Sequence, residues 1–125
     1  KYEGKDINNI VCILCNILKK YKKINIYICS FNEHIIEKLM SKKITNKIGI
    51  IVGFGFNMDK INNNFDFTLI RNKKINSIDI NKEYYIYGVN TVKEFIKLTD
   101  MFPCDRIKII SDKPYLFNDI KIKCK

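Results

Sequence analysis

The sequence has no tryptophan, a single histidine (His34), and only two prolines and five glycines. Two of its 23 basic residues are arginines, Arg71 and Arg106. No apolar run approaches the ~18 residues of a membrane-spanning helix. The polar start at Lys1–Asp6 leads into no signal-like segment with a small-residue cleavage site. We therefore expect a soluble chain without a transmembrane segment, and a start at Lys rather than Met indicates a processed or internal beginning.

The scarcity of arginine also limits what the net charge of +10 implies. Such a charge is typical of proteins that bind nucleic acid or anionic membranes. Readout of bases and phosphates, however, favours the planar fork of arginine. Here the charge comes from lysines that are scattered along the chain, with no run longer than two. The composition favours a solvated basic surface, and it disfavours specific nucleic-acid binding.

Cysteine gives no metal or disulfide framework. The chain has five cysteines, an odd number. Cys12 and Cys15 form one CxxC pair, but no second pair exists and only His34 could complete a tetrahedral zinc site. We expect Cys12 to face away from the apolar stripe of its helix and Cys15 to flank that stripe. Reduced thiols in a cytoplasmic location fit this pattern best.

A length of 125 residues predicts one domain, and apolar periodicity predicts its elements. Three helices are expected, with Asp6, Asn32 and Thr91 as N-caps. The third starts with the capping box Thr91-Val92-Lys93-Glu94 and ends at Pro103. Phe54–Asn64 is predicted as a loop, and Arg71–Lys82 has room for at most one helical turn. Strands are expected at Ile24–Cys29, Ile48–Val52, Phe65–Ile70, Tyr84–Tyr87 and Ile107–Ile110.

The strands are mostly continuous and rich in isoleucine rather than alternating, which indicates a parallel sheet covered on both faces. The predicted fold class is therefore α/β, built from parallel β/α units. Functional residues of such proteins lie where strands end. Tyr87–Asn90 and Ser111–Pro114 are accordingly the candidate site segments.

The strand ends resemble, in order, those of the C-terminal part of the glycerophosphodiester phosphodiesterase family, a (β/α)8 TIM barrel. Ser30-Phe31-Asn32 resembles that family's Ser-Phe-Asn strand end, and Lys47–Val52 resembles its next strand. Phe65–Ile70 is similar to its sixth strand. Tyr87-Gly88-Val89-Asn90 falls where the family commonly has Trp-Thr-Val-Asn, and Ser111-Asp112-Lys113-Pro114 matches its closing Thr-Asp-x-Pro. The likeness implies that residues 1–125 form one incomplete domain, a partial barrel of roughly strands four to eight.

The resemblance also implies which functional residues are present. Lys1 would contact the phosphate, and Phe31 and Tyr87 would line the substrate pocket. The family's two catalytic histidines and its ligands for a divalent cation, Mg²⁺ or Ca²⁺, belong to strands that this chain lacks, and surface-exposed His34 would not replace them. The expected enzyme class is phosphoric diester hydrolase, acting in lipid and glycerol metabolism. This chain alone is expected to be inactive, with no catalytic residue and no metal or other cofactor of its own.

Three alternatives remain open from the residues. The chain could be a non-catalytic remnant, or pseudoenzyme, that acts as a binding or interaction module. Its two open sheet edges would then pair with a second copy or with an N-terminal half of the barrel. It could instead be an unrelated α/β domain that binds a small anion or nucleotide, although Gly53-Phe54-Gly55 lacks the third glycine of a dinucleotide fingerprint. The last alternative is a basic nucleic-acid binder.

Overall fold

The computed structural model describes residues 6–53, 65–76 and 82–121, and the predicted loop Phe54–Asn64 lies outside them. The described helices are α1 (Ile7–Lys20), α2 (Glu33–Ser41) and α3 (Val92–Met101), with short 3₁₀ helices η2 (Asn72–Lys74) and η3 (Pro114–Phe117). The strands are β1 (Ile28–Ser30), β2 (Ile48–Ile51), β3 (Phe67–Arg71), β4 (Glu83–Tyr87) and β5 (Ile107–Ile110). None of these helices is long and apolar enough to cross a bilayer.

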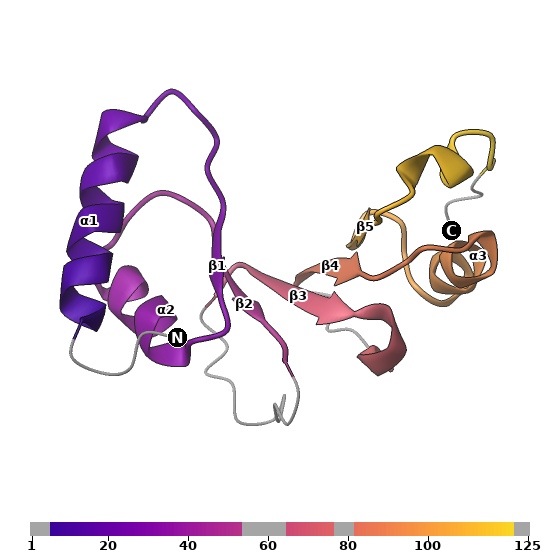
Figure 1. The fold of residues 1–125 in the computed structure, drawn as a ribbon, viewed down its shortest axis with the longest axis horizontal. Helices are drawn as coiled ribbons and strands as arrows, with labels where there is room; N and C mark the ends of the chain where they lie inside the picture. Colours follow the sequence, from indigo (N-terminus) through magenta and orange to yellow (C-terminus); the bar gives the residue numbers. More distant parts are fainter. Residues whose placement is uncertain (1–5, 54–64, 77–81, 122–125) are drawn as a thin grey trace.

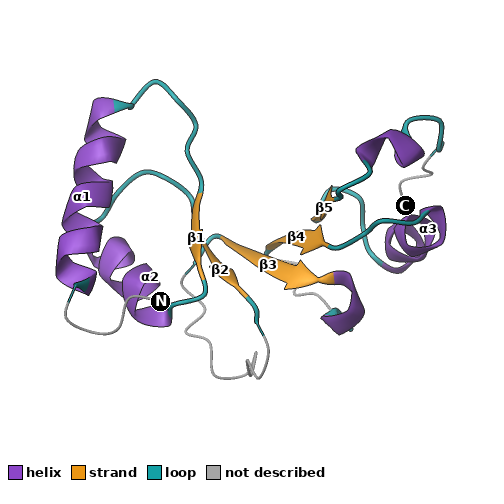
Figure 2. Ribbon diagram, viewed as in Figure 1, coloured by secondary structure: helices purple, strands orange, loops and turns teal. Residues whose placement is uncertain are grey.

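The five strands form one parallel sheet in the order β1-β2-β3-β4-β5, so each strand lies beside its neighbours in sequence (Figure 2). This confirms the α/β class and the parallel β/α units. The sheet is open, with β1 and β5 as its edge strands, and a closed TIM barrel is not formed by the residues described. α1 and α2 lie beside β1, and α3 lies at the β5 end (Figure 1).

All three helices pack on the same face of the sheet. Ile50, Thr68, Tyr84 and Ile107 are register partners across four strands, so their side chains share one face. Ile50 packs in the cluster that α1 and α2 cover, and Tyr84 and Ile107 pack in the cluster that α3 covers. The β1–β2 and β4–β5 crossovers, which contain α2 and α3, therefore cover one face, whereas parts of the β2–β3 and β3–β4 connections lie outside the described residues.

The buried residues divide into two clusters. The N-terminal cluster joins α1 and α2 to β2, and the C-terminal cluster joins α3 to β3, β4 and β5. Members of the N-terminal cluster are Val11, Ile36, Leu39, Ile48, Ile50 and Phe65. Members of the C-terminal cluster are Val52, Ile70, Ile75, Tyr84, Ile86, Val89, Phe95, Leu98, Phe102 and Ile107.

The opposite face corrects the prediction that both faces are covered. Along β4, residues alternate between buried and half-buried, and Ile110 of β5 is 42% exposed. Aromatic rings cover part of this face: Phe67 lies against Tyr27 and Tyr85, with ring centroids 5.8 and 5.1 Å apart. The isoleucine-rich strands read as continuous runs, but in the described chain only the helix-facing side is fully packed.

Glycine at position 49 makes the aromatic packing on this face achievable. A Cβ atom on Gly49 would lie 2.3 Å from Cε2 of Phe67, its register partner on β3. The ring of Phe67 therefore occupies the space that a side chain at position 49 would fill. Beside it, Glu83 forms ion pairs with two lysines, Lys47 at 3.5 Å and Lys108 at 3.9 Å. Glu83, with smaller effects of the Tyr27 and Tyr85 side chains, raises the pKa of Lys47.

The helix ends follow the predicted chemistry at two of three positions. Asn32 Oδ1 accepts from the backbone of His34 and Ile35, and Thr91 forms the predicted capping box with Glu94. Asp6 precedes α1, but its side chain makes no capping hydrogen bond. Its φ and ψ of −99° and 0° depart from the extended backbone that lets an N-cap side chain reach the first amides.

The first strand is shorter than predicted, starting at Ile28 instead of Ile24. Ile24 donates its backbone N–H to the Tyr21 carbonyl in a turn, and the carbonyl of Ile26 accepts from the side chain of Asn46. Ladder pairing starts where Ile28 donates to the Lys47 carbonyl. The apolar run Ile24–Cys29 is therefore only partly a strand, because the chain opposite its first residues does not offer a paired backbone.

Candidate functional site

The carboxyl ends of the five parallel strands meet at one edge of the sheet, and this edge forms the candidate site. β1 leads into Phe31, β2 leads into Gly53, β3 ends at Arg71, β4 ends at Tyr87, and β5 leads into Ser111. Parallel strands gather loops from distant parts of a sequence in this way, which is why α/β proteins bind ligands there.

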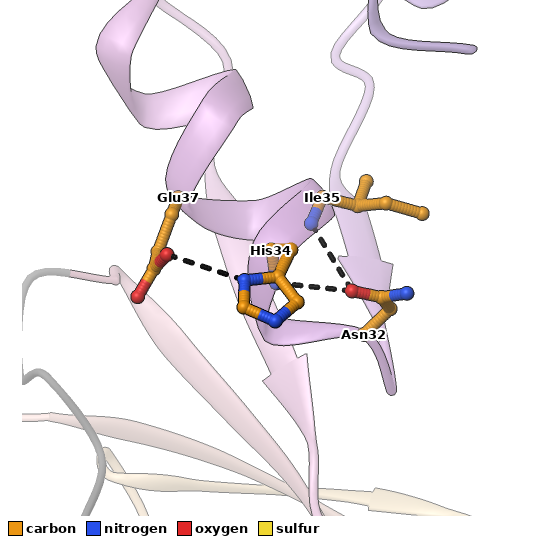
Figure 3. A network of polar contacts seen from close by, with 4 residues as sticks. All are labelled: Asn32, His34, Ile35 and Glu37. Atoms are coloured by element: carbon orange, nitrogen blue, oxygen red, sulfur yellow. Dashed lines mark hydrogen bonds and ion pairs between the residues drawn. The ribbon is translucent and has the colours of Figure 1, made fainter. Parts of the chain in front are cut away.

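At the β1 end, a short polar turn fixes the start of α2. Ser30 Oγ accepts from the backbone N–H of Asn32, and Asn32 caps the helix. His34 points to the outside of α2, where its Nδ1 lies 3.8 Å from Glu37 (Figure 3). Its side chain is 79% exposed, which agrees with the expected surface position.

Phe31 and Tyr87, the predicted pocket walls, do not lie together. Phe31 is 63% exposed and faces Gly53, whose position for a Cβ atom is 3.3 Å from the Phe31 ring. Tyr87 is half-buried on β4, three strands away, a separation of about 14 Å at the usual strand spacing. The two rings therefore stand on separate parts of the edge. Lys1, the predicted phosphate contact, lies outside the described residues.

Arg71 is a candidate that sequence reasoning missed. It is the last residue of β3 and pairs in register with Tyr87. The aliphatic part of the Arg71 side chain lies beside Gly88, since a Cβ atom on Gly88 would be 3.8 Å from Arg71 Cγ. Gly88 has a φ of +76°, which residues other than glycine rarely adopt. Arg71 has no ion pair with any residue that the structure describes. The sequence did contain a signal for Arg71: the chain has only two arginines, and one of them lies at the end of a strand.

The ends of β4 and β5 are tied together by Asn90. Its Oδ1 accepts from Ser111 Oγ at 3.1 Å and from the backbone N–H of Asp112 at 3.0 Å. Its Nδ2 donates to Asp112 Oδ2 at 2.9 Å. Ser111 Oγ also accepts from the backbone of Lys113, which tightens the turn. The structure thus brings the two segments predicted for the site into one network, with Asp112 held by Asn90 as part of the turn.

A second set of contacts joins β3 to the start of α3. Asn72 Nδ2 donates to the Gly88 carbonyl at 2.9 Å, while Asn72 Oδ1 is buried without a hydrogen-bond partner among the described residues. Glu94 accepts from the backbone of Asn90 and Thr91. The hydrogen bond from Asn90, with smaller contributions from the Thr91 and Asn72 side chains, lowers the pKa of the Glu94 carboxyl below its ordinary value. The carboxyl ends of β3, β4 and β5 are therefore connected by the side-chain amides of Asn72 and Asn90.

The described part of the chain gathers no three His, Cys, Asp or Glu side chains that could hold a metal ion. Cys12 is exposed and Cys15 is half-buried, as expected, and both are free thiols. The edge offers an arginine, a tyrosine and ordered side-chain amides, which are groups that bind anions. In comparisons with known proteins, no family model and no curated protein matches this chain.

Proposed function

We propose that this chain forms the C-terminal part of a (β/α)8-barrel domain of the glycerophosphodiester phosphodiesterase type. Its contribution is one wall of the pocket that holds a glycerophosphodiester. The observation that carries the proposal is the order of the sheet, five parallel strands in chain order with their helices on one face. (β/α)8 barrels have the same strand order, and the strand-end motifs that resemble the family lie at the carboxyl edge of this sheet, which supports the proposal.

In this proposal Arg71 contacts the phosphate, because a guanidinium binds phosphate oxygens through two parallel N–H donors. Tyr87 stands next to it in register and supplies an aromatic surface for the glycerol or head group. The Asn90 network holds the neighbouring turn at Ser111 and Asp112. Phe31 belongs to a separate part of the rim, and Lys1 keeps its expected phosphate contact.

The acid, the base and the ligands of a divalent cation come, in this proposal, from strands outside residues 1–125. The cation would stabilise charge on the phosphodiester, the largest contribution in reactions of this kind. The open β1 and β5 edges and the half-exposed sheet face favour completion by further polypeptide. That polypeptide is a preceding segment, a partner or a second copy.

Two measurements test the proposal. The coding sequence upstream of Lys1 is expected to encode a His-Arg-Gly and a Glu-x-Asp segment. An upstream stop codon or unrelated sequence would instead favour a non-catalytic interaction module. The chain by itself is expected to show no hydrolysis of glycerophosphocholine with Mg²⁺ or Ca²⁺, and clear turnover would contradict the assignment of catalysis to other strands.

Binding provides the sharper test of the site. Glycerol 3-phosphate, titrated into the chain and followed by amide NMR, is expected to shift the signals of Arg71, Tyr87 and Gly88. Arg71→Gln is expected to weaken this binding about tenfold, the effect of losing one charged hydrogen-bonding group. Arg106→Gln is the matched control, since Arg106 precedes β5 at the opposite edge of the sheet. Equal weakening by both substitutions would overturn the assignment of Arg71.

A further inference from the structure

A second cationic surface lies far from the strand ends, in the groove between α1 and α2. The groove has a volume of about 470 Å³, within the range of pockets that hold small molecules. Val11, which is 1% exposed, forms part of its floor. The polar side chains around it are Asn8, Asn16 and Ser41. This is a concave surface with an apolar base and hydrogen-bonding groups above it.

Three lysines line the groove: Lys19 from α1, and Lys38 and Lys42 from α2 and its C-terminal cap. No aspartate or glutamate is among the described residues that line it. The local charge is therefore about +3 without a compensating carboxylate, and the concave shape brings these charges together. A groove of one sign concentrates ions of the opposite sign.

The lysines are not needed to complete the end of α2. Lysines often occur near helix C-termini because they offset the partial negative charge of the last carbonyls. Here the chain satisfies those carbonyls itself. Ser41 Oγ donates to the Lys38 carbonyl, and the backbone N–H groups of Lys42 and Lys43 donate to Leu39 and Met40. The ammonium groups of Lys19 and Lys42 line the groove and are not required to complete the end of α2.

Lys38 shows how the groove is organised. Its Nζ donates to Asn8 Oδ1, which joins the two helices across the groove. This contact positions one ammonium group, whereas Lys19 and Lys42 have no such contact with the residues that the structure describes. One ammonium group held by Asn8, with two further ammonium groups in the lining of the same groove, suits a ligand that carries more than one anionic group.

We propose that the groove between α1 and α2 binds a small ligand with at least two phosphate groups. Ammonium groups bind phosphate as point charges from several directions. A single phosphate would neutralise only part of the charge of the three lysines, whereas a diphosphate brings about enough negative charge to match it. The side-chain amide N–H groups of Asn8 and Asn16 then donate to the remaining oxygens of the ligand, while Ser41 Oγ keeps its hydrogen bond to the Lys38 carbonyl. The site is independent of the strand-end pocket, and it stands if that pocket proves wrong.

Pyrophosphate is the probe for a direct test by titration calorimetry. The double variant Lys19→Gln and Lys42→Gln is expected to weaken binding at least about tenfold, because it removes two charged hydrogen-bond donors. The matched control is Lys93→Gln with Lys121→Gln, two exposed lysines outside the groove, which gives the same net charge. Equal weakening in both variants would mean that only the overall charge binds, and absence of pyrophosphate binding would also overturn the proposal.

The cysteines provide a test in the unmodified protein. Cys12 lines the groove and is exposed, whereas Cys29 is exposed on β1 at the sheet. Saturating pyrophosphate is expected to slow alkylation of Cys12 by iodoacetamide about fivefold or more, by occlusion and by added negative charge near the thiol. Cys29 should react at an unchanged rate. Binding without protection of Cys12 would place the ligand elsewhere and refute the groove.

Phosphate groups also reach proteins as lipid head groups, and the same footprint separates the two sources. Vesicles of phosphatidylcholine with a phosphatidylinositol bisphosphate form the second arm. Protection of Cys12 by soluble pyrophosphate alone assigns the groove to a free ligand. Protection of Cys12 by pyrophosphate and also by the vesicles means that the groove binds phosphate groups of lipid head groups as well as free phosphates. Protection by neither refutes the site.

Discussion

The N-terminal half, residues 6–53, and the C-terminal half, residues 65–121, extend one sheet by different means. In the first, two helices cover two strands, and the contacts are mainly apolar. In the second, one helix covers three strands, and side-chain amides tie the strand ends together. The first helices of the two halves also differ, because α3 has a complete capping box while α1 has no side-chain capping bond; α2, in the N-terminal half, is capped by Asn32.

This difference separates two kinds of candidate site. The C-terminal half has a rigid, hydrogen-bonded edge, on which Arg71 and Tyr87 have defined neighbours. The N-terminal half has a groove that is lined by three lysines and, among the described residues, by no aspartate or glutamate. Ordered polar groups suit recognition of a ligand by its shape, whereas lysine ammonium groups suit recognition of a ligand by its negative charge.

The largest effects are expected from Leu39→Ala and Ile86→Ala, one in each cluster. Both side chains are fully buried. Each substitution should lower the free energy of unfolding by about 3 kcal/mol, from lost burial and the cavity left behind. Because β2 and β3 pair in one sheet, both variants should shift a single cooperative urea transition, measured by circular dichroism. If the protein instead showed two urea transitions, and each variant shifted only one of them, the two halves would fold independently.

A smaller but sharper effect is expected at the junction of the halves. Gly49→Ala should destabilise the protein by about 2 kcal/mol, because its Cβ would overlap the Phe67 ring and force it off its packing on Tyr27 and Tyr85. Gly53→Ala is the control. Its Cβ would meet only the exposed Phe31 ring, at 3.3 Å, and should change the melting temperature little. Similar losses in both variants would show that backbone freedom, rather than the Phe67 contact, sets the cost.

Local rules predicted much of this fold, because the signals were local. Apolar periodicity predicted α2 and α3, and the Thr91 capping box and the stop at Pro103 follow from residues within one turn. Four of the five strands lie close to their expected ranges. Parallel pairing followed from the isoleucine-rich strands, although the exposure of one sheet face did not, because it depends on what else is present to cover it.

The errors and omissions concern contacts between distant residues. β1 is short because Asn46 bonds the Ile26 carbonyl, twenty positions away in sequence. The network of Asn90 with Ser111 and Asp112 joins two strand ends that sequence placed at the site but could not place in contact. The groove lysines belong to different helices, so their convergence is visible only after α1 and α2 pack. The sequence could therefore show that functional residues lie at the ends of the strands. Which of these side chains are in contact could be seen only in the folded structure.

The smallest expected effects compare the two helix starts. Thr91→Ala should lower the free energy of unfolding by about 1 kcal/mol, because the backbone N–H of Glu94 loses its acceptor. Asp6→Ala should have almost no effect on the same urea transition, since Asp6 makes no capping bond. A loss at Asp6 as large as that at Thr91 would contradict the difference between the N-termini of α1 and α3.

Glu94, the second residue of the capping box, should also make the stability of the protein depend on pH. The folded pKa of Glu94 lies below its ordinary value, mainly because its carboxylate accepts from the Asn90 backbone. A depressed folded pKa means that ionised Glu94 stabilises the protein at neutral pH, and that this contribution disappears as the pH falls through the acid range toward the folded value. Glu94→Gln should therefore flatten the acid limb of stability against pH, whereas Glu37→Gln on the exposed surface of α2 should leave it nearly unchanged. Parallel acid limbs for wild type and Glu94→Gln, measured by urea unfolding at a series of pH values, would mean that the capping box does not set the acid sensitivity of the C-terminal half.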